Sequence, residues 1–292
     1  MLFCGCYYLN IPIIYMDSDN RKEKIKIQSN LIRELIQRSK NQAIKLPLNS
    51  YKEIPQKIIQ FWDDHNHLPT DVKACIDTWS ITEDQGVERV LFDKKQAGNF
   101  IFEKLGERYK KAFDRCYHPA MQSDLFRLCY IFIEGGCYID ADDAYIGSQI
   151  LHLFQDARLK IQPLCYDVAT HTMVPASIFT KPGASDNNWI FYFNNNPLIA
   201  GKENIIIERA LNQAVNVLQQ DCINGLPEIQ STTGPGNLTK SIFDAITEDS
   251  DVENSLLVLS EWENIAISKW PLSYRNDARN WRLANSQEYT AQ

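Results

Sequence analysis

Residues 137–145, CYIDADDAY, constrain the fold more than any other stretch, because three carboxylates follow a short apolar run. The run Cys137 to Ile139 predicts a buried strand, and side chains on a strand alternate between its two faces. Asp140 and Asp142 are therefore expected to point to the same side, where two carboxylates in a low dielectric repel each other. A cation, an arginine or a set of backbone N–H groups must offset that repulsion. A lone DxD triplet can also be a solvated acidic turn, so its surroundings in the sequence decide the interpretation.

A helix is predicted immediately before this strand. It begins at Pro119, carries a buried apolar stripe and ends at a Gly-Gly pair that favours a left-handed stop. Asp124 and Arg127 lie one turn apart on its polar side, where the spacing alone is that of an ordinary salt bridge. Since this pair lies close in sequence to the DxD triplet, we expect both to face one cleft.

Strands and helices alternate through the first half of the chain. Residues 57–62 and 87–92 have the pattern of strands, and a helical face lies between them. This alternation predicts an α/β layered domain, and 292 residues suffice for one large domain with a buried core. We expect that domain to span residues 51–292. A helical extension, residues 1–50, should precede it, with an amphipathic helix over residues 20–41.

Composition excludes several classes of protein. Lysine and arginine number 30 against 37 aspartate and glutamate, and no arginine-rich run interleaves with aromatic residues, so no nucleic-acid partner is expected. The longest apolar runs, LCYIFI at 128–133 and LLVL at 256–259, are far shorter than the ~20 residues of a transmembrane span. The eight cysteines form no CxxC pair, which favours reduced core thiols. We expect a cytoplasmic protein, either free or peripheral at a membrane.

Three stretches together resemble the DXD-containing glycosyltransferase family: IPQKIIQFW at 54–62, VERVLFDKKQAGNFI at 87–101 and SDLFRLCYIFIEGGCYIDADD at 123–143. That family includes yeast initiating mannosyltransferases, bacterial capsule and lipopolysaccharide glycosyltransferases and, more distantly, the glucosyltransferase domains of large clostridial toxins. A later stretch, STTGPGNLTKSIF at 231–243, is similar to the family's TGP…T segment. The resemblance implies a GT-A type fold, a Rossmann-like mixed sheet flanked by helices that binds a nucleotide sugar.

The same resemblance implies roles for individual residues. Asp142 is expected to bind a metal ion directly, and Asp140 to contact the ribose or to reach the metal through water. Their hard oxygen atoms suit Mn²⁺ or Mg²⁺, and such an ion stabilises the charge on departing phosphates. Asn188, in an asparagine-bearing segment similar to one near the donor sugar, joins these two as an expected catalytic residue. The expected donor-binding residues are Trp62, which stacks on the base, Asp124 and Arg127, which hold sugar hydroxyls, and Tyr138, Gly136 and Trp281.

The closing segment departs from the family pattern. Many relatives have a histidine directly before a tryptophan there, whereas this chain has Asn280 before Trp281. An amide oxygen can still bind a hard cation, so Asn280 is expected as a further metal ligand. We also expect residues 268–281 to fold back over the nucleotide.

The sequence therefore predicts a metal-dependent glycosyltransferase that moves a sugar from a UDP- or GDP-sugar, with retention, to a glycan, lipid-linked saccharide or protein acceptor, as in polysaccharide biosynthesis. One alternative is a phosphatase-like hydrolase, because an apolar strand running into DxD also describes an aspartyl-phosphate nucleophile. Another is a degenerate transferase that only binds the sugar nucleotide.

Overall fold

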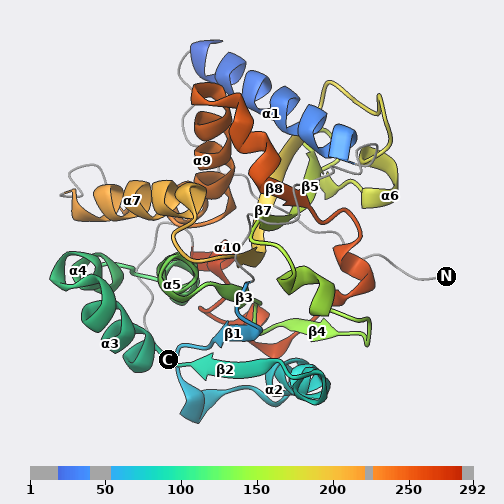
Figure 1. Ribbon diagram of the computed structural model, residues 1–292. Helices are drawn as coiled ribbons and strands as arrows, with labels where there is room; N and C mark the ends of the chain where they lie inside the picture. Colours follow the sequence, from blue (N-terminus) through green and yellow to red (C-terminus); the bar gives the residue numbers. More distant parts are fainter. Residues whose placement is uncertain (1–18, 40–53, 221–225, 285–292) are drawn as a thin grey trace.

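The computed structural model describes residues 19–39, 54–220 and 226–284, in which strands and helices alternate (Figure 1). The strands are β1 (Lys57–Phe61), β2 (Glu88–Phe92), β3 (Gly136–Tyr138), β4 (Asp143–Tyr145), β5 (Leu159–Asp167), β6 (Thr172–Met173), β7 (Trp189–Ala200), β8 (Leu256–Val258) and β9 (Ala266–Ser268). The α-helices are α1 (Asp19–Ser39), α2 (Thr70–Thr78), α3 (Lys94–Leu105), α4 (Glu107–Asp114), α5 (Pro119–Glu134), α6 (Ala176–Phe179), α7 (Ile205–Gln219), α8 (Ile229–Thr232), α9 (Pro235–Glu248) and α10 (Trp281–Ala284). Short 3₁₀ helices lie at His65–His67, Trp79–Gln85, Leu151–Phe154, Ser250–Ser255, Trp262–Asn264 and Ser273–Asn276.

One mixed sheet has the strand order β2-β1-β3-β7-β5-β6, and β8 pairs with β5 outside this path. β1 runs parallel to β2 and β3, whereas β7 runs antiparallel to both β3 and β5. Because parallel strands end at the same edge of a sheet, Trp62 after β1 and Asp140 after β3 come to one edge. The predicted α/β class, a mixed sheet flanked by helices, is confirmed.

Neighbouring residues of the central strands face opposite sides of this sheet, as the period of two requires. One set packs under the larger helices: Ile59, Tyr138 and Leu198. The other set packs on the opposite face, in a smaller core that contains Trp79 and Trp262: Ile58, Cys137 and Ile199. The central strands of the sheet are therefore buried on both faces.

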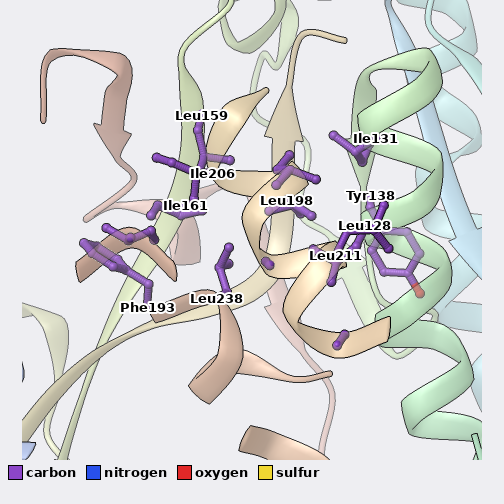
Figure 2. Packing of buried hydrophobic residues seen from close by; sticks show 14 of the residues in the cluster. Leu128, Ile131, Tyr138, Leu159, Ile161, Phe193, Leu198, Ile206, Leu211 and Leu238 are labelled. Atoms are coloured by element: carbon purple, nitrogen blue, oxygen red, sulfur yellow. The ribbon is translucent and has the colours of Figure 1, made fainter. Parts of the chain in front are cut away.

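The larger core joins α5, α7 and α9 to the sheet, and Figure 1 shows α5 beside the α3–α4 pair and below α7. Figure 2 labels residues of this core from two helices and the central strands, together with Leu238 of α9: Leu128, Ile131, Tyr138, Leu159, Ile161, Phe193, Leu198, Ile206 and Leu211. Each fully buried aliphatic side chain contributes roughly 1.5–3 kcal/mol to folding. This packing fixes α5, and with it the polar residues on its outer side.

Helix α1, predicted over residues 20–41, packs against β7 and α9. Ile32, Leu35 and Ile36 are buried in the larger core, and the hydroxyl of Ser29 accepts a hydrogen bond of 3.0 Å from the backbone N–H of Phe191. The predicted boundary at residue 50 lies outside the described residues, so the division into an extension and a domain stays a prediction.

Helix α5 has the predicted termini. His118 caps its first turn, Pro119 is its first residue, and Gly135 ends it at φ +68°. Gly136 follows at φ +115°, and a Cβ there would lie 3.0 Å from the backbone oxygen of Lys57. A glycine is therefore needed for β3 to pair closely with β1, and this pairing aims the DxD triplet at the sheet edge.

Two expectations from composition can be compared with the structure. The cysteines in the described part are buried free thiols, in agreement with the predicted reduced core: Cys75, Cys116, Cys129, Cys137 and Cys165. Among residues 19–39, 54–220 and 226–284, no helix has both the length and the apolar character needed to cross a bilayer.

Candidate active site

A cavity of about 960 Å³ opens at the edge of the sheet where β1 and β3 end. Its walls come from the end of β1, the N-terminal half of α5, residues 140–143, the asparagines of β7 and residues 274–282. These segments lie far apart in the sequence. The antiparallel ribbon of β4 and β9 brings the last of them to the DxD triplet, because it pairs Asp143 with Ser268.

Arg127 is the centre of one charge cluster in this cavity. Its guanidinium lies 2.7 Å from Asp140 and 3.1 Å from Asp124, donates a 2.8 Å hydrogen bond to the backbone oxygen of Asn195, and lies over the ring of Tyr138 at 4.3 Å from the centroid. The expected i,i+3 pair therefore exists, and it includes the first aspartate of the triplet. The Asp124–Arg127 pair and the DxD triplet line one cavity, as the sequence predicts.

Asp142 has different partners. The hydroxyl of Tyr274 donates a hydrogen bond of 2.8 Å to its carboxylate, and Arg275 forms an ion pair with the same oxygen. Each aspartate of the triplet is thus balanced by an arginine, one from α5 and one from the closing segment. An arginine, one of the expected partners, therefore offsets the charge of each of these two aspartates.

Asp143, the third aspartate, also lines the cavity. One of its oxygens accepts a hydrogen bond of 2.9 Å from the side-chain amide of Asn196, while Oδ1 is buried without a partner. Burial, followed by the charges of Asp142 and Asp140, raises the pKa of Asp143 to about 8. Burial also raises the pKa of Asp140 to about 6, against the opposing charge of Arg127. The three carboxylates lie close enough together that their mutual repulsion, added to burial, favours a neutral Asp143.

This donor set fits a hard divalent cation. Asp140 and Asp142 present carboxylate oxygens to the cavity, and the unpartnered oxygen of Asp143 lies in the same cluster of mutually interacting carboxylates. Oxygen atoms of this kind are the ligands that Mn²⁺ and Mg²⁺ prefer. Within the described residues, no group of three histidine, cysteine, aspartate or glutamate side chains is already arranged around one metal position.

Trp62 follows the end of β1 and lines the cavity, and its side chain is buried in a small apolar cluster. The ring of Tyr274 meets it edge to face at 5.4 Å, and the guanidinium of Arg279 lies 5.5 Å from its centroid. The indole Nε1 is buried and lacks a hydrogen-bond partner. Trp62 therefore joins the DxD side of the cavity to the closing segment, which folds back as expected.

Residues 54–158 match the family model described as a glycosyltransferase sugar-binding region containing a DXD motif. The chain carries a DXD-type glycosyltransferase region. The match ends just before β5, and it contains Trp62, the Asp124–Arg127 pair and the DxD triplet. The class of enzyme predicted from the sequence is thus confirmed.

A solved structure named "PaToxG Glycosyltransferase" is similar to the chain at 20% sequence identity and a TM-score of 0.45. The similarity covers 80% of this chain and 82% of that one. No curated protein matches the chain in sequence.

Several predicted site residues of the glycosyltransferase lie away from the cavity lining. Gly136 and Tyr138 are buried in β3, where the ring of Tyr138 packs against the guanidinium group of Arg127. Asn188 is exposed at the far end of β7, where its backbone N–H donates to Asp186. Asn280 is buried, and its amide donates to the backbone oxygen of Arg275 and accepts from the backbone N–H of Arg282.

The structure also brings residues to the site that sequence reasoning missed. Asn195 donates a 2.8 Å hydrogen bond to Asp124, and Asn196 accepts one of 3.0 Å from the backbone N–H of Asp140. The run NNNP was visible in the sequence, but nothing in it distinguished these asparagines from Asn188. Asp143 was also not predicted as a site residue, although it was visible in the sequence as the third aspartate of the run.

The TGP segment of the glycosyltransferase, resembling its family counterpart, also reaches this site. The hydroxyl of Thr233 donates a hydrogen bond of 3.3 Å to Asp124. A Cβ on Gly234 would lie 3.2 Å from the same carboxylate, so the glycine allows the turn to approach. The TGP segment and the helix that carries Asp124, both of which resemble parts of the family pattern, are therefore in contact at Asp124.

Proposed function

We propose that this glycosyltransferase moves a sugar from a UDP- or GDP-sugar to a glycan, a lipid-linked saccharide or a protein, with Mn²⁺ or Mg²⁺ and with retention. The observation that supports this best is the pair Asp140 and Asp142 in the wall of a cavity that Trp62 also lines. A volume of about 960 Å³ is in the range of small-molecule and cofactor sites, enough for a nucleotide sugar. Retention rests on the family resemblance.

In this proposal Asp142 binds the metal ion directly, and Asp140 binds it through water or holds the ribose. The ion, when bound, stabilises the negative charge on the departing diphosphate as a Lewis acid. Asn280 can serve as a further ligand only if its amide leaves the two backbone groups that it now contacts. The carboxylates of the triplet are therefore the main candidates.

The donor would lie across the cavity from Trp62 to Asp124. Trp62 offers a ring face for the base, and its free Nε1 offers a hydrogen-bond donor. Asp124 and Arg127 would hold sugar hydroxyls, because their own partners already fix them in position. Trp281, which lines the cavity, would cover the donor.

In the transfer step, the bond between the anomeric carbon and the phosphate oxygen breaks, and its electron pair leaves with the nucleoside diphosphate. The acceptor hydroxyl oxygen bonds to the anomeric carbon, and its proton passes to the departing oxygen of the diphosphate. The chain's contribution is to hold both partners in position and to keep water from the reacting carbon. A catalytic role for Asn188 stays a prediction; Asn195 and Asn196 are better placed for it, because they contact Asp124 and Asp140.

We assign the catalytic domain to residues 51–292 and regard residues 1–50 as an N-terminal helical extension. A cytoplasmic protein, free or peripheral at a membrane, is the setting in which we expect it to act.

The test is release of nucleotide from a panel of UDP- and GDP-sugars with Mn²⁺, with and without a chelator. Metal-dependent release with one donor, enhanced by an acceptor, supports the proposal, and the anomeric configuration of the product tests retention. Release of phosphate from simple phosphate esters, with no nucleotide release, would support the hydrolase instead. Donor binding without turnover of any donor would support a protein that only binds the sugar nucleotide.

A further inference from the structure

Two arginines of the closing segment, Arg275 and Arg282, gather at one side of the cavity. Both line it, and both guanidinium groups lie over the ring of Trp270, at 4.2 and 5.9 Å from its centroid. Arg282 also lies over Trp281 at 4.7 Å. Both guanidinium groups therefore make cation–π contacts with the same indole ring. Stacking of this kind uses the flat face of a guanidinium, so its N–H groups at the edge remain able to donate hydrogen bonds.

These charges are only partly balanced. Arg275 pairs with Asp142, whereas Arg282 forms no salt bridge within the part of the chain that the structure describes. Nη1 of Arg282 and Nε of Arg275 are both buried without a hydrogen-bond partner. Burial, and then the charge of Arg275, lower the pKa of Arg282 from its ordinary value. Buried donors on a charged group are normally paired, so these two N–H groups are suited to donate to an anion.

The position of the site indicates which anion fits. It lies beside Asp142, and Tyr274 links Asp142 to Trp62, the proposed base-stacking residue. On the other side, Asp140 joins Asp142 to Arg127 and the proposed sugar site. An anion held here would lie between base and sugar. Two guanidinium groups offer several N–H donors in planar forks, a geometry that matches phosphate oxygens.

We propose that Arg282, together with Arg275, binds the diphosphate of the nucleotide-sugar donor. This inference rests on the proposed function, which it deepens by assigning the residues that hold the leaving group. Arg275 would then serve two partners: the carboxylate of Asp142 in the donor-free protein, and phosphate oxygen once the donor is bound. Among the described residues Arg282 has no carboxylate partner to give up, so it contributes the larger share of the anion affinity.

The test measures binding of inorganic pyrophosphate by titration calorimetry in metal-free buffer, where no divalent ion can mediate the contact. Wild type should bind pyrophosphate, and Arg282→Gln should bind it about tenfold more weakly or worse, since it loses charge-assisted hydrogen bonds. Arg209→Gln is the matched control, because it removes an arginine charge from an exposed pair with Glu248 on α7. It should bind pyrophosphate like wild type.

A second variant keeps the test decisive if Arg282→Gln does not fold. Arg282→Lys keeps the charge but loses the fork, so a smaller loss of about threefold is expected. The inference is overturned if wild type binds no pyrophosphate, if the position 282 variants bind it as wild type does, or if Arg209→Gln loses as much affinity.

The same experiment separates this inference from the proposed function. Pyrophosphate binding that depends on Arg282, in a protein that turns over no sugar nucleotide, would leave the anion site standing and reject the transferase. Sugar transfer by a protein in which Arg282→Gln does not alter pyrophosphate binding would reject the anion site and leave the transferase standing.

Discussion

Arg127 and Asp140 form an ion pair of 2.7 Å between Nη2 and Oδ1, in which the arginine side chain is only 4% exposed. The same guanidinium lies 3.1 Å from Asp124 and donates to the backbone oxygen of Asn195. One side chain therefore ties α5 to the DxD triplet and to β7. The position of the triplet depends on this buried charge as well as on apolar packing.

Loss of this arginine should destabilise the fold strongly. In Arg127→Met the carboxylates of Asp124 and Asp140 lose their shared partner, and we expect the free energy of unfolding to fall by about 3–5 kcal/mol. Urea denaturation at pH 7 measures the change. Arg209→Met, which breaks an exposed pair, serves as the control with an effect below about 1 kcal/mol. A change of under about 1 kcal/mol in Arg127→Met would contradict the central role of this residue.

Asp142→Asn should abolish metal-dependent turnover and leave the fold intact. The substitution removes the charge that the proposed function assigns to direct metal binding, while the amide oxygen can still accept the hydrogen bond from Tyr274. Electron paramagnetic resonance of added Mn²⁺ measures binding, and nucleotide release measures turnover. Asp244→Asn, in an exposed pair with Lys240, is the control. Full activity of Asp142→Asn at saturating Mn²⁺ would show that this carboxylate is not the metal ligand.

Trp62→Ala should weaken donor binding more than it slows the chemical step. Stacking of an aromatic side chain on a base contributes about 1–3 kcal/mol, and it is made equally in the ground and transition states. We expect donor KM to rise about tenfold with a smaller change in kcat. Trp62→Phe keeps a ring face and should recover part of the affinity. An unchanged KM with a lower melting temperature would identify Trp62 as a residue of the core only.

His118 should make stability depend on pH. Its Nε2 lies 2.9 Å from the backbone oxygen of Ala278, and its Nδ1 accepts a hydrogen bond from the backbone N–H of Ala120. Protonation would place two donors face to face at Nδ1, and burial lowers the pKa of His118 from its ordinary value of 6.5. The unfolded chain therefore binds a proton that the folded protein does not, so the free energy of unfolding falls as the pH drops below about 6.5.

The measurement is urea denaturation of wild type and His118→Gln from pH 7.5 to pH 5.5. The variant cannot titrate at this position, and the other titrating groups are common to both proteins. The difference in unfolding free energy between the two should therefore shrink as the pH falls. A constant difference over this range would show that His118 titrates equally in both states.

Much of the site could be predicted from the sequence because it depends on short-range geometry. Asp124 and Arg127 meet because residues three apart lie on one side of a helix. The Gly-Gly stop needs backbone angles that only glycine adopts readily, and it fixes how α5 leads into β3. The family resemblance lies in this same local unit, α5 followed by β3 and the triplet, and the family match includes it.

The asparagines show what the sequence left undecided. Asn188 lies just before β7 and Asn196 lies in its second half, and both belong to short runs of asparagine. The pairing of Tyr138 with Leu198 decides between them, because it places Asn196 beside Asp140. Strand register depends on contacts across the whole sheet, so no local pattern specifies it.

The contacts of the closing segment likewise depend on long-range strand pairing. Its return to the cavity was expected, but the partners of its side chains depend on how β9 pairs with β4, more than a hundred residues earlier in the chain. That pairing brings the closing segment, and with it Arg275, to Asp142. Which charges the site contains can be read from the local sequence around the triplet and the closing segment. Only the long-range packing decided which of them face one another, because a charge pair forms where the chain's buried surfaces place it.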